Sequence, residues 1–451
     1  MAVQPADKRM RVSNWGRYPT VEAEMISCTN VRQLQSIVRT SESLIARGLG
    51  RCYGDSSLNG KIVSMLKMNR IPSFDESTGV IECEAGVSFA ELIELLVPRG
   101  WFLPVTPGTK FVTVGGAIAA DIHGKNHHVS GSFSRHTRSI VLMTSEGKLV
   151  RCSRQNDPAL FWATCGGMGL TGIIISASFQ LLRIQSAFMA QETIKTRNID
   201  EVLEAFQMSQ SWTYSVAWID CYAKGNSFGR SLLFRGEHAS EERVRAEGLK
   251  GNPLELRHAF SLSVPFDLPA FVLSQPMLKL VNAGIYGLRK SGMSQQFVGL
   301  DEFFYPLDRI HRWNRMYGKQ GLVQYQFVLP KATSREGITK VLHEVSNFRY
   351  GSFLAVLKLF GKQEGMLSFP QEGYTLALDF PVSKELFPFL DRLDRIVLEH
   401  GGKLYLAKDG RMSKNMFAET YVQRRVFLKT KRRTDRRNLF QSLQSARVGL
   451  S

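Results

Sequence analysis

The sequence predicts an α+β protein with two domains, one built around a ligand cradle of small residues and one built on an antiparallel sheet. The chain has 451 residues, more than a single hydrophobic core usually holds. Segments rich in glycine and alanine gather before residue 190, whereas longer alternating segments and more aromatic residues follow. Towards the C-terminus, strand and helix patterns follow in the order β-α-β-β-α-β, which indicates one antiparallel sheet backed by two helices. We therefore expect a domain boundary near residue 190.

Helix and strand signals alternate in the first domain. Asn30 precedes the helical pattern VRQLQSIVR, and the strand SLIA runs directly into the glycine loop RGLGRCYGD. Ser88 and Glu91 form a capping box for the helix FAELIELLV. Asp157 and Pro158 open a helix through PALFWAT, which leads into the small-residue segment CGGMGLTG and the strand IIISASFQL.

The second domain carries longer alternating elements. Its predicted order is strand VQYQFVLP, a helix from Ser334, strands FLAVLKLF and YTLALDF, a helix capped by Ser383 and, after Gly401, strand KLYLA. Before these elements, residues 251–294 hold prolines and scattered apolar residues, but no apolar run of bilayer length. We interpret this segment as a mobile lid or a surface-seeking stretch.

The chain is strongly basic, with a formal net charge of +18. Residues 423–437, QRRVFLKTKRRTDRR, contain Asp435 as their only acid. Such a run can contact nucleic acid, an anionic membrane surface or a phosphorylated ligand, or it can form a solvated face. No nucleic-acid-binding module accompanies it, so we expect no nucleic-acid partner. The N-terminus lacks the apolar core of a signal peptide, and we expect a cytoplasmic protein.

Cysteine and histidine spacing argues against a metal or disulfide framework. The six cysteines stand far apart without a CxxC pair, so we expect reduced and mostly buried thiols. The cluster His123, His127 and His128 could suggest a metal, but Asp121 is the only nearby carboxylate. We predict no bound metal.

Three segments, 47–55, 106–132 and 165–172, contain few bulky side chains. Where side chains shrink to glycine and alanine, a flat ring or a phosphate can lie against the main chain and its unpaired N–H groups. The glycines of the first segment miss the GxGxxG spacing of a Rossmann fold, and no helix follows them directly. No Gly-Lys pair is followed by the Ser or Thr of a P-loop. We therefore expect the three segments to converge on one dinucleotide in a different fold.

The chain resembles the vanillyl-alcohol-oxidase superfamily of FAD enzymes (PCMH-type) in RGLGRCYGD, PGTKFVTVGGAIAADIHGKNHH, FWATCGGMGLTGII, FLAVLKLFG and LYLAKDGR. Within that superfamily it is most similar to the flavin oxidases of decaprenylphosphoryl-β-D-ribose, the flavin half of a 2-epimerase. The resemblance covers nearly the whole chain. It implies an FAD-binding domain over 8–186, an inserted α+β substrate domain over 187–402, and a segment 403–451 that returns to the FAD domain.

The resemblance also implies which residues bind FAD. It places the pyrophosphate, ribityl chain and isoalloxazine against Arg47, Gly48, Leu49, Gly50, Arg51, Tyr53, Gly108, Thr109, Thr113, Gly115, Gly116, Ala117, Ile122, His123, Gly124, Asn126, His127 and Lys408. Ile173 and Ile174 are expected on the adenine side. Many relatives tether FAD through a histidine in the first loop, and residues 47–55 contain none, so we predict non-covalent FAD.

The reaction implied by the resemblance oxidises the C2 hydroxyl of a polyprenylphosphoryl-β-D-ribose to a 2-keto intermediate by hydride transfer to flavin N5. A separate NAD(P)H-dependent short-chain reductase would complete the epimerisation to the arabinose form. A lipid-linked sugar phosphate would bring the protein to the inner face of the plasma membrane as a peripheral protein. The alternatives are an aldonolactone or alditol oxidase of the same superfamily, and a basic surface-binding protein that retains a flavin fold.

Three residues are candidates for the proton transfer that accompanies hydride loss. Lys408, in the AKD motif at the end of strand KLYLA, is the first choice for contact with the reacting region. Tyr53 and His123 are alternative proton acceptors, and His123 ranks as a residue that positions flavin and substrate. The identity of the base stays open among the three.

The substrate site is expected on the strands of the second domain. Lys358 shares a strand face with Leu354 and Val356, and an inward lysine there needs an anionic partner such as a substrate phosphate. Gln324 and Gln326 share a strand face, a spacing that suits hydrogen bonds to sugar hydroxyls. Ala377 stands where close relatives can carry a cysteine, so a thiol-directed inhibitor would find no target there.

Overall fold

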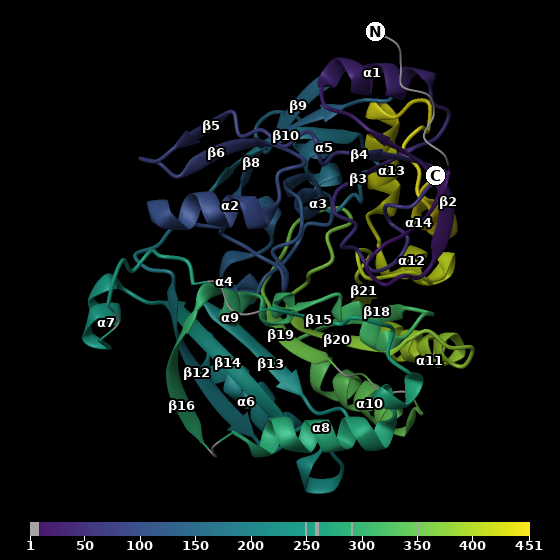
Figure 1. The fold of residues 1–451 in the computed structure, drawn as a ribbon. Coiled ribbons are helices and arrows are strands. Elements are labelled where there is room, and N and C mark those ends of the chain that lie inside the picture. The colour runs from purple at the N-terminus through teal and green to yellow at the C-terminus, as the bar shows by residue number, and fades with distance from the viewer. Residues whose placement is uncertain (1–8, 249, 258–260, 290–291, 350–351, 353) are drawn as a thin grey trace.

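Two small sheets form the upper part of the molecule in Figure 1, which is a computed structural model describing residues 9–248, 250–257, 261–289, 292–349, 352 and 354–451. A four-stranded sheet has the order β1 (Met10–Ser13), β2 (Thr20–Ser27), β4 (Lys61–Ser64), β3 (Ile45–Arg47). A five-stranded antiparallel sheet has the order β5 (Ser73–Asp75), β6 (Val80–Glu84), β10 (Ile173–Gln180), β8 (Thr137–Met143), β9 (Leu149–Ser153). The α+β class predicted from the sequence is confirmed.

The helices of this part are α1 (Val31–Thr40), α2 (Phe89–Leu96), α3 (Val114–Ala119), α4 (His127–Ser130) and α5 (Pro158–Thr164). Three of them, α1, α2 and α5, begin where their capping residues predict. The side chains of Asn30, Ser88 and Asp157 accept hydrogen bonds from the first turns of α1, α2 and α5, and Glu91 completes the predicted capping box. Helix α2 ends just before Val97, because Pro98 has no N–H to continue the ladder.

An eight-stranded antiparallel sheet dominates the lower part of the molecule. Its order is β16 (Met293–Gly299), β12 (Phe188–Thr196), β14 (Ser231–His238), β13 (Tyr214–Ile219), β19 (Ala355–Phe360), β20 (Gly373–Pro381), β18 (Leu322–Pro330), β21 (Lys403–Leu404). The elements from β18 to β21 confirm the predicted β-α-β-β-α-β order, although Phe353 of the expected strand lies outside the described residues. The sheet is wider than predicted, because four earlier strands continue it, and three helices pack on it: α6 (Ile199–Met208), α10 (Ser334–Asn347) and α11 (Leu386–Glu399).

Two predicted element boundaries in this domain are wrong. Helix α11 begins after Glu385 rather than with a cap at Ser383. The expected strand KLYLA pairs with the sheet only at its first two residues, and the chain then turns, because the N–H groups of Lys408 and Asp409 both donate to the carbonyl of Tyr405. Lys408 therefore lies in a tight turn and not at a strand end.

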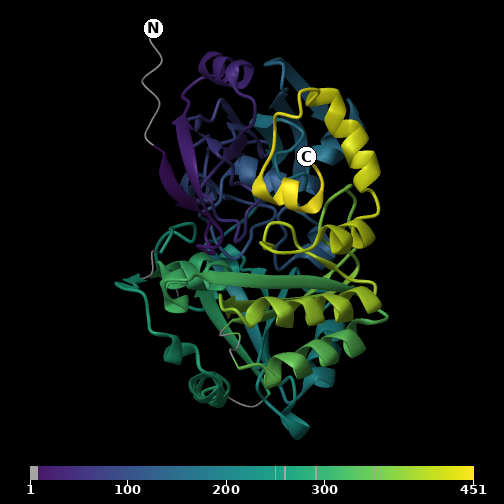
Figure 2. The same cartoon turned by 90° about the vertical axis from the view of Figure 1, so that its right-hand side faces the viewer.

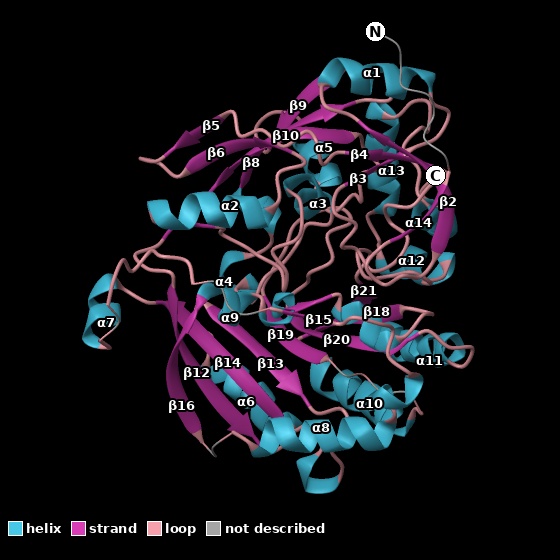
Figure 3. Ribbon diagram, in the orientation of Figure 1, coloured by secondary structure: helices cyan, strands magenta, loops and turns pink. Residues whose placement is uncertain are grey.

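The segment 251–294 contains more regular structure than its sequence indicates. Its described residues include β15 (Leu262–Ser263), which pairs with β17 (Ile310–His311), and helix α8 (Gln275–Gly287), while 258–260 and 290–291 lie outside the description. Helix α8 crosses the lower end of the sheet in Figures 1 and 3. Two further helices of the lower part are α7 (Glu241–Ala246) and α9 (Leu300–Phe304).

The C-terminal helices α12 (Lys414–Thr420), α13 (Arg424–Thr434) and α14 (Leu443–Val448) lie beside the N-terminal part, as Figure 2 shows. Leu44 exchanges backbone hydrogen bonds with Leu439 and Gln441. Part of the basic run holds the C-terminal segment in place: Lys431 forms a buried ion pair with Asp435, and Arg437 donates to backbone carbonyls of the first domain.

Within the described ranges, no helix is both long and apolar enough to cross a bilayer. All six cysteines are free, and only Cys52 is not fully buried.

Candidate active site

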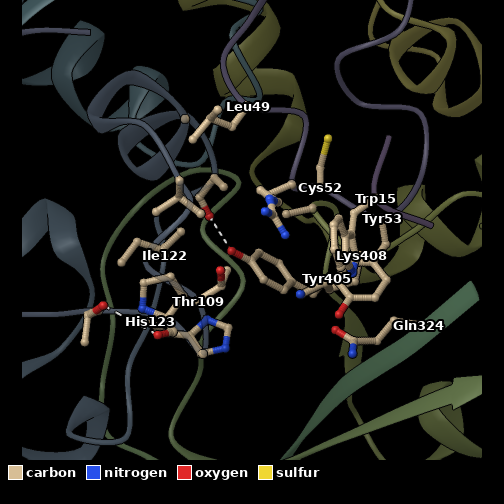
Figure 4. Close-up of a pocket in the computed structure, with 18 of the residues that line it drawn as sticks. Trp15, Leu49, Cys52, Tyr53, Thr109, Ile122, His123, Gln324, Tyr405 and Lys408 are labelled. Atoms are coloured by element: carbon tan, nitrogen blue, oxygen red, sulfur yellow. Dashed lines mark hydrogen bonds between the residues drawn. The ribbon is translucent and has the colours of Figure 1, made fainter. Parts of the chain in front are cut away.

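A cavity of about 450 Å³ lies between the N-terminal part and the cavity face of the large sheet. The predicted segments 47–55, 106–132 and 165–172 all contribute to its walls, although they are far apart in the chain. The opposite wall comes from β13, β18, β19 and β20, and the turn after β21 closes one end. Figure 4 shows His123 and Lys408 pointing into the same cavity, with Tyr405 between them in this view. The predicted convergence on one elongated site is thus present.

Glycine is required where two of these walls meet. Gly50 has a φ of +65°, a left-handed conformation that glycine adopts without strain. A Cβ on Gly48 would lie 2.2 Å from the Thr113 hydroxyl oxygen, which itself caps α3 by accepting the N–H of Gly116. Where Gly48 meets Thr113, the cavity wall is therefore a backbone surface without room for a side chain, the kind of cradle that fits a pyrophosphate or a flat ring.

Most of the residues predicted for cofactor and substrate line this cavity. They are Arg47, Gly48, Leu49, Gly50, Arg51, Tyr53, Gly108, Thr109, Thr113, Gly115, Gly116, Ile122, His123, Gly124, Ile174, Gln324, Gln326, Lys358, Ala377 and Lys408.

Four predicted residues lie behind the lining instead. Ala117 is fully buried and faces the hydrophobic core, because it is on the inner side of α3. Asn126 donates to the carbonyl of Pro104 at 2.8 Å, and His127 packs on the Phe360 ring while accepting the N–H of Gly361. Ile173 is buried in the core next to α1. These four side chains are not among the residues that line the cavity.

The structure adds lining residues that the sequence prediction missed. Tyr405 donates to the carbonyl of Ala120 at 2.9 Å and stacks on Phe369, and Lys125 lies inside the DIHGKNHH string. Both stood within recognised motifs and could have been included. Trp15 and Trp313, whose rings contact each other at 5.6 Å, come from segments without a motif.

Three lysines at the cavity have lowered pKa values. Burial lowers the pKa of Lys125 and of Lys408 to about 7, and that of Lys358 to about 8. The ammonium of Lys408 lies 3.9 Å from the centre of the Tyr53 ring. Lysines of this kind can exchange protons near neutral pH, and the cluster favours an anionic ligand.

His123 and Tyr53 are poorer proton acceptors than Lys408. Gln326 donates its amide hydrogen to His123 Nε2 at 3.1 Å, which assigns the proton of the ring to Nδ1. That Nδ1 is buried with no partner among the described residues, and burial holds the pKa of His123 well below its usual value. Burial also raises the pKa of Tyr53 far above the usual value, so its phenol keeps its proton. The Nδ1–H is therefore a buried donor without a protein partner among the described residues.

The histidine cluster is not arranged as a metal site. The rings of His123 and His127 are 6.4 Å apart, and His128 Nε2 bonds to the carbonyl of Trp212. Across the described part of the chain, no group of three or more His, Cys, Asp or Glu side chains could hold a metal ion.

Asp121 fastens the second small-residue segment to the loop after β19. Its carboxylate accepts hydrogen bonds from the Ser134 N–H, Gln363 and Ser368. Burial raises its pKa from 3.8 to about 6, so the folded protein holds a proton there that the unfolded chain has released between roughly pH 4 and 6.

We expect the stability of the protein to fall as pH rises through that window. At 1.36 kcal/mol per pKa unit, the loss attributable to Asp121 is roughly 3 kcal/mol. Urea unfolding at a series of pH values should show this decline relative to an Asp121→Asn variant, whose side chain does not titrate. Parallel pH profiles for the two proteins would contradict the assignment.

The cradle belongs to a flavoprotein. Residues 23–153 match the FAD binding domain family, which confirms the predicted cofactor, and the protein is an FAD-dependent oxidoreductase. The chain is 37% identical to decaprenylphosphoryl-beta-D-ribose oxidase of Mycolicibacterium smegmatis over 98% of its own length and 97% of the relative. It belongs to the family of that oxidase.

Other relatives are more distant. An uncharacterized protein of Streptomyces coelicolor is 31% identical over 81% of this chain and 100% of its own length. L-gulonolactone oxidase of Bos taurus is 26% identical over 44% of this chain and 45% of the relative. The similarity to the lactone oxidase thus spans less than half of either protein.

Proposed function

We propose that the protein oxidises the C2 hydroxyl of decaprenylphosphoryl-β-D-ribose, or of a ribose on a similar polyprenyl phosphate, to the 2-keto sugar. The observation that carries this proposal is the near full-length similarity to the mycobacterial oxidase, combined with a cavity lined by lysine, glutamine and apolar side chains. An aldonolactone or alditol oxidase is the alternative, but its relatives match less than half of the chain.

The cavity residues divide the work in a way that suits this substrate. Bound FAD supplies the hydride acceptor. Lys408 takes the hydroxyl proton, while Gln326, whose amide nitrogen is held by His123 and Thr375, offers its carbonyl oxygen to a sugar hydroxyl. Lys358 and Lys125 provide positive charge for the phosphate.

The apolar wall gives room for the first isoprene units. It consists of Val216, Trp218, Phe234, Leu354 and Val356, all of which line the cavity. These side chains come from neighbouring strands β13, β14 and β19 or from just before β19. Burial of a lipid chain against them is favourable at about 25 cal/mol per Å² of apolar surface.

Anaerobic mixing with decaprenylphosphoryl ribose tests the proposal. The substrate should bleach the absorption band of the oxidised flavin, and L-gulonolactone or free alditols should leave it unchanged. If the free lactones or alditols bleach the flavin and the lipid-linked sugar does not, the alternative is correct. Because the keto sugar must then be reduced on the other face, we propose a separate NAD(P)H-dependent short-chain reductase as the partner that completes the epimerisation for cell-envelope arabinan.

We further propose that FAD is held without a covalent bond. The loop 47–55 contains no histidine, and Arg51 occupies its cavity side, with its guanidinium 4.0 Å from the centre of the Trp15 ring. Acid precipitation should release the flavin into the supernatant, where its absorbance can be measured. A yellow pellet that survives washing in denaturant would contradict this prediction.

We propose that the protein works at the cytoplasmic membrane surface through the segment 262–293. This segment exposes Leu262, Phe266, Phe271, Leu280, Leu288 and Met293, with Leu288 88% exposed. Arg257 precedes this segment in the chain, and Arg289 lies within it. Exposed apolar residues beside basic ones favour adsorption to an anionic leaflet.

A double substitution, Leu280→Asp with Leu288→Asp, should reduce sedimentation with vesicles that contain anionic lipid. Each buried or membrane-inserted leucine contributes roughly 1.5–3 kcal/mol, so a loss of at least tenfold in partitioning is expected. Leu149→Asp, on β9 in the upper part of the molecule, is a matched control because Leu149 is also exposed. Equal loss with the control, or no loss, would contradict the placement of the membrane surface.

A further inference from the structure

Asp379 is a fully buried carboxylate on the strand face that lines the cavity, next to lining residues but not itself one of them. Strands β18 and β20 pair so that Gln324 lies opposite Asp379 and Gln326 opposite Ala377, which puts all four side chains on the cavity face. Gln324 donates to Asp379 Oδ1 at 2.5 Å. Asp379 Oδ2 has no hydrogen-bond partner among the described residues. Asp379 is 0% exposed, and it was not among the residues predicted for the site.

A buried carboxylate with one free oxygen is costly unless a positive charge lies in its field. Burial raises the pKa of this carboxyl from 3.8 to about 7, and the hydrogen bond from Gln324 and the charge of Lys408 oppose that rise. The other titratable groups that face Asp379 are the phenols of Tyr53 and Tyr317, and both keep their protons. Two side chains of the same cavity wall connect Asp379 to Lys408: the Lys408 ammonium lies 3.9 Å from the centre of the Tyr53 ring, and Gln324, which donates to Asp379, lies next to Tyr53 in Figure 4.

Three hydrogen bonds hold the turn that carries Lys408, so the charged groups around this lysine keep fixed positions. Tyr405 donates its N–H to the carbonyl of Gln326, and Tyr53 donates its N–H to the carbonyl of Ala407. Gln444, from α14, donates to the carbonyl of Leu406 at 2.7 Å. Lys358 disfavours a charge on Lys408, whereas Asp379 and Cys52 favour it. Asp379 thus opposes the effect of burial on this lysine.

We propose that Asp379 is a positioning residue that makes Lys408 a competent proton acceptor by stabilising its ammonium form. This inference rests on the proposed alcohol oxidation. In the reaction, the substrate O–H bond breaks and its proton forms a new N–H bond on the neutral amine of Lys408. The C–H bond breaks with its electron pair, which leaves as hydride to the flavin, and the carbon–oxygen double bond forms. The carboxylate of Asp379 then balances the new charge on Lys408.

The protonation of Lys408 can be measured without substrate. The FAD-loaded protein is treated with acetic anhydride at a series of pH values, and acetylation of Lys408 is quantified by peptide mass spectrometry, since only the neutral amine reacts. In Asp379→Asn, which keeps an oxygen to accept from Gln324 but loses the charge, we expect the midpoint for Lys408 to move at least one pH unit lower. The Asp379→Glu variant should restore most of the shift. An unchanged midpoint in Asp379→Asn would overturn the proposal.

Two internal controls separate this effect from a general disturbance. The midpoint of Lys358 should stay in place, because burial alone lowers its pKa. Asp121→Asn, which removes another fully buried carboxylate away from Lys408, should not move the Lys408 midpoint. If Asp379→Asn does not fold, Gln324→Met provides a second variant: loss of its hydrogen bond favours protonation of Asp379, so the Lys408 midpoint should move in the same direction by a smaller amount.

The pH profile of flavin reduction then tests the catalytic part. In Asp379→Asn, the acid limb of the reduction rate should move to lower pH together with the acetylation midpoint. A limb that stays in place while the midpoint moves would overturn the link to proton transfer. If decaprenylphosphoryl ribose reduces neither wild type nor variant, yet the midpoint moves, the proposed substrate fails while the charge coupling between Asp379 and Lys408 stands.

Discussion

Replacing Lys408 with alanine is expected to slow reduction of the flavin by substrate by about 10²- to 10⁴-fold while FAD stays bound, because a positioned proton acceptor contributes on that scale. The competing acceptors cannot substitute for it: burial keeps His123 neutral with a weakly basic ring, and Tyr53 keeps its phenolic proton. The rate is measured by anaerobic stopped-flow absorbance, and the bound FAD by the ratio of flavin to protein absorbance.

Lys403→Ala is the matched control for this experiment. Lys403 is a partly buried lysine of β21 whose pKa is lowered by burial to about 8, but its ammonium donates to the carbonyl of Ser368 and lies outside the cavity lining. Its loss should cost stability and leave the reduction rate within a few-fold of wild type. Equal rate losses in the two variants would mean that Lys408 acts structurally.

Replacing Gly48 with alanine is expected to weaken FAD binding by about 10- to 100-fold. The new Cβ would lie 2.2 Å from the Thr113 hydroxyl oxygen, and that oxygen is the N-cap of α3. The collision pushes apart two walls of the cradle at once. Overpacking of this kind costs about 1–3 kcal/mol, and each 1.4 kcal/mol changes affinity about tenfold. Titration of apoprotein with FAD, followed by quenching of flavin fluorescence, gives the dissociation constant.

The control for that substitution is Gly60→Ala, because a Cβ at Gly60 meets no atom within 4 Å. Its FAD affinity should match wild type. Thermal unfolding of both apoproteins shows whether Gly48→Ala has simply unfolded the domain. Wild-type affinity in the Gly48→Ala protein would mean that α3 moves without cost and that the cradle is less rigid than its contacts indicate.

Local signals predicted much of this fold. Asn30, Ser88 and Asp157 cap helices where their patterns indicate, because an N-cap depends on only a few neighbouring residues. The convergence of the three small-residue segments could also be predicted, because a shared ligand explains why all three contain few bulky side chains. The full width of the large sheet could not be predicted from the sequence, because its first four strands lack the regular alternation of apolar and polar residues of the later ones.

The parts of the candidate site that depend on strand register could not be predicted from the sequence. Asp379 faces the cavity only because β20 pairs with β18 in one particular alignment, 55 residues apart, and no local pattern fixes that alignment. Ala117 was assigned to the cofactor because its neighbours are, but the helical period of α3 turns it to the core. The position of Lys408 depends on hydrogen bonds to Tyr405 that end the strand early.

The anchoring of the Lys408 turn by α14 has a consequence for chains that end early. Gln444 holds the turn from 38 residues further along the chain, and Arg447 bridges Asp409 in that turn to Asp55 in the first glycine loop. A prematurely terminated chain that lacks α14 would keep the backbone hydrogen bonds of this turn to Gln326 and Tyr53 but lose the contacts of Gln444 and Arg447. We expect Lys408 to be held less firmly in such a chain.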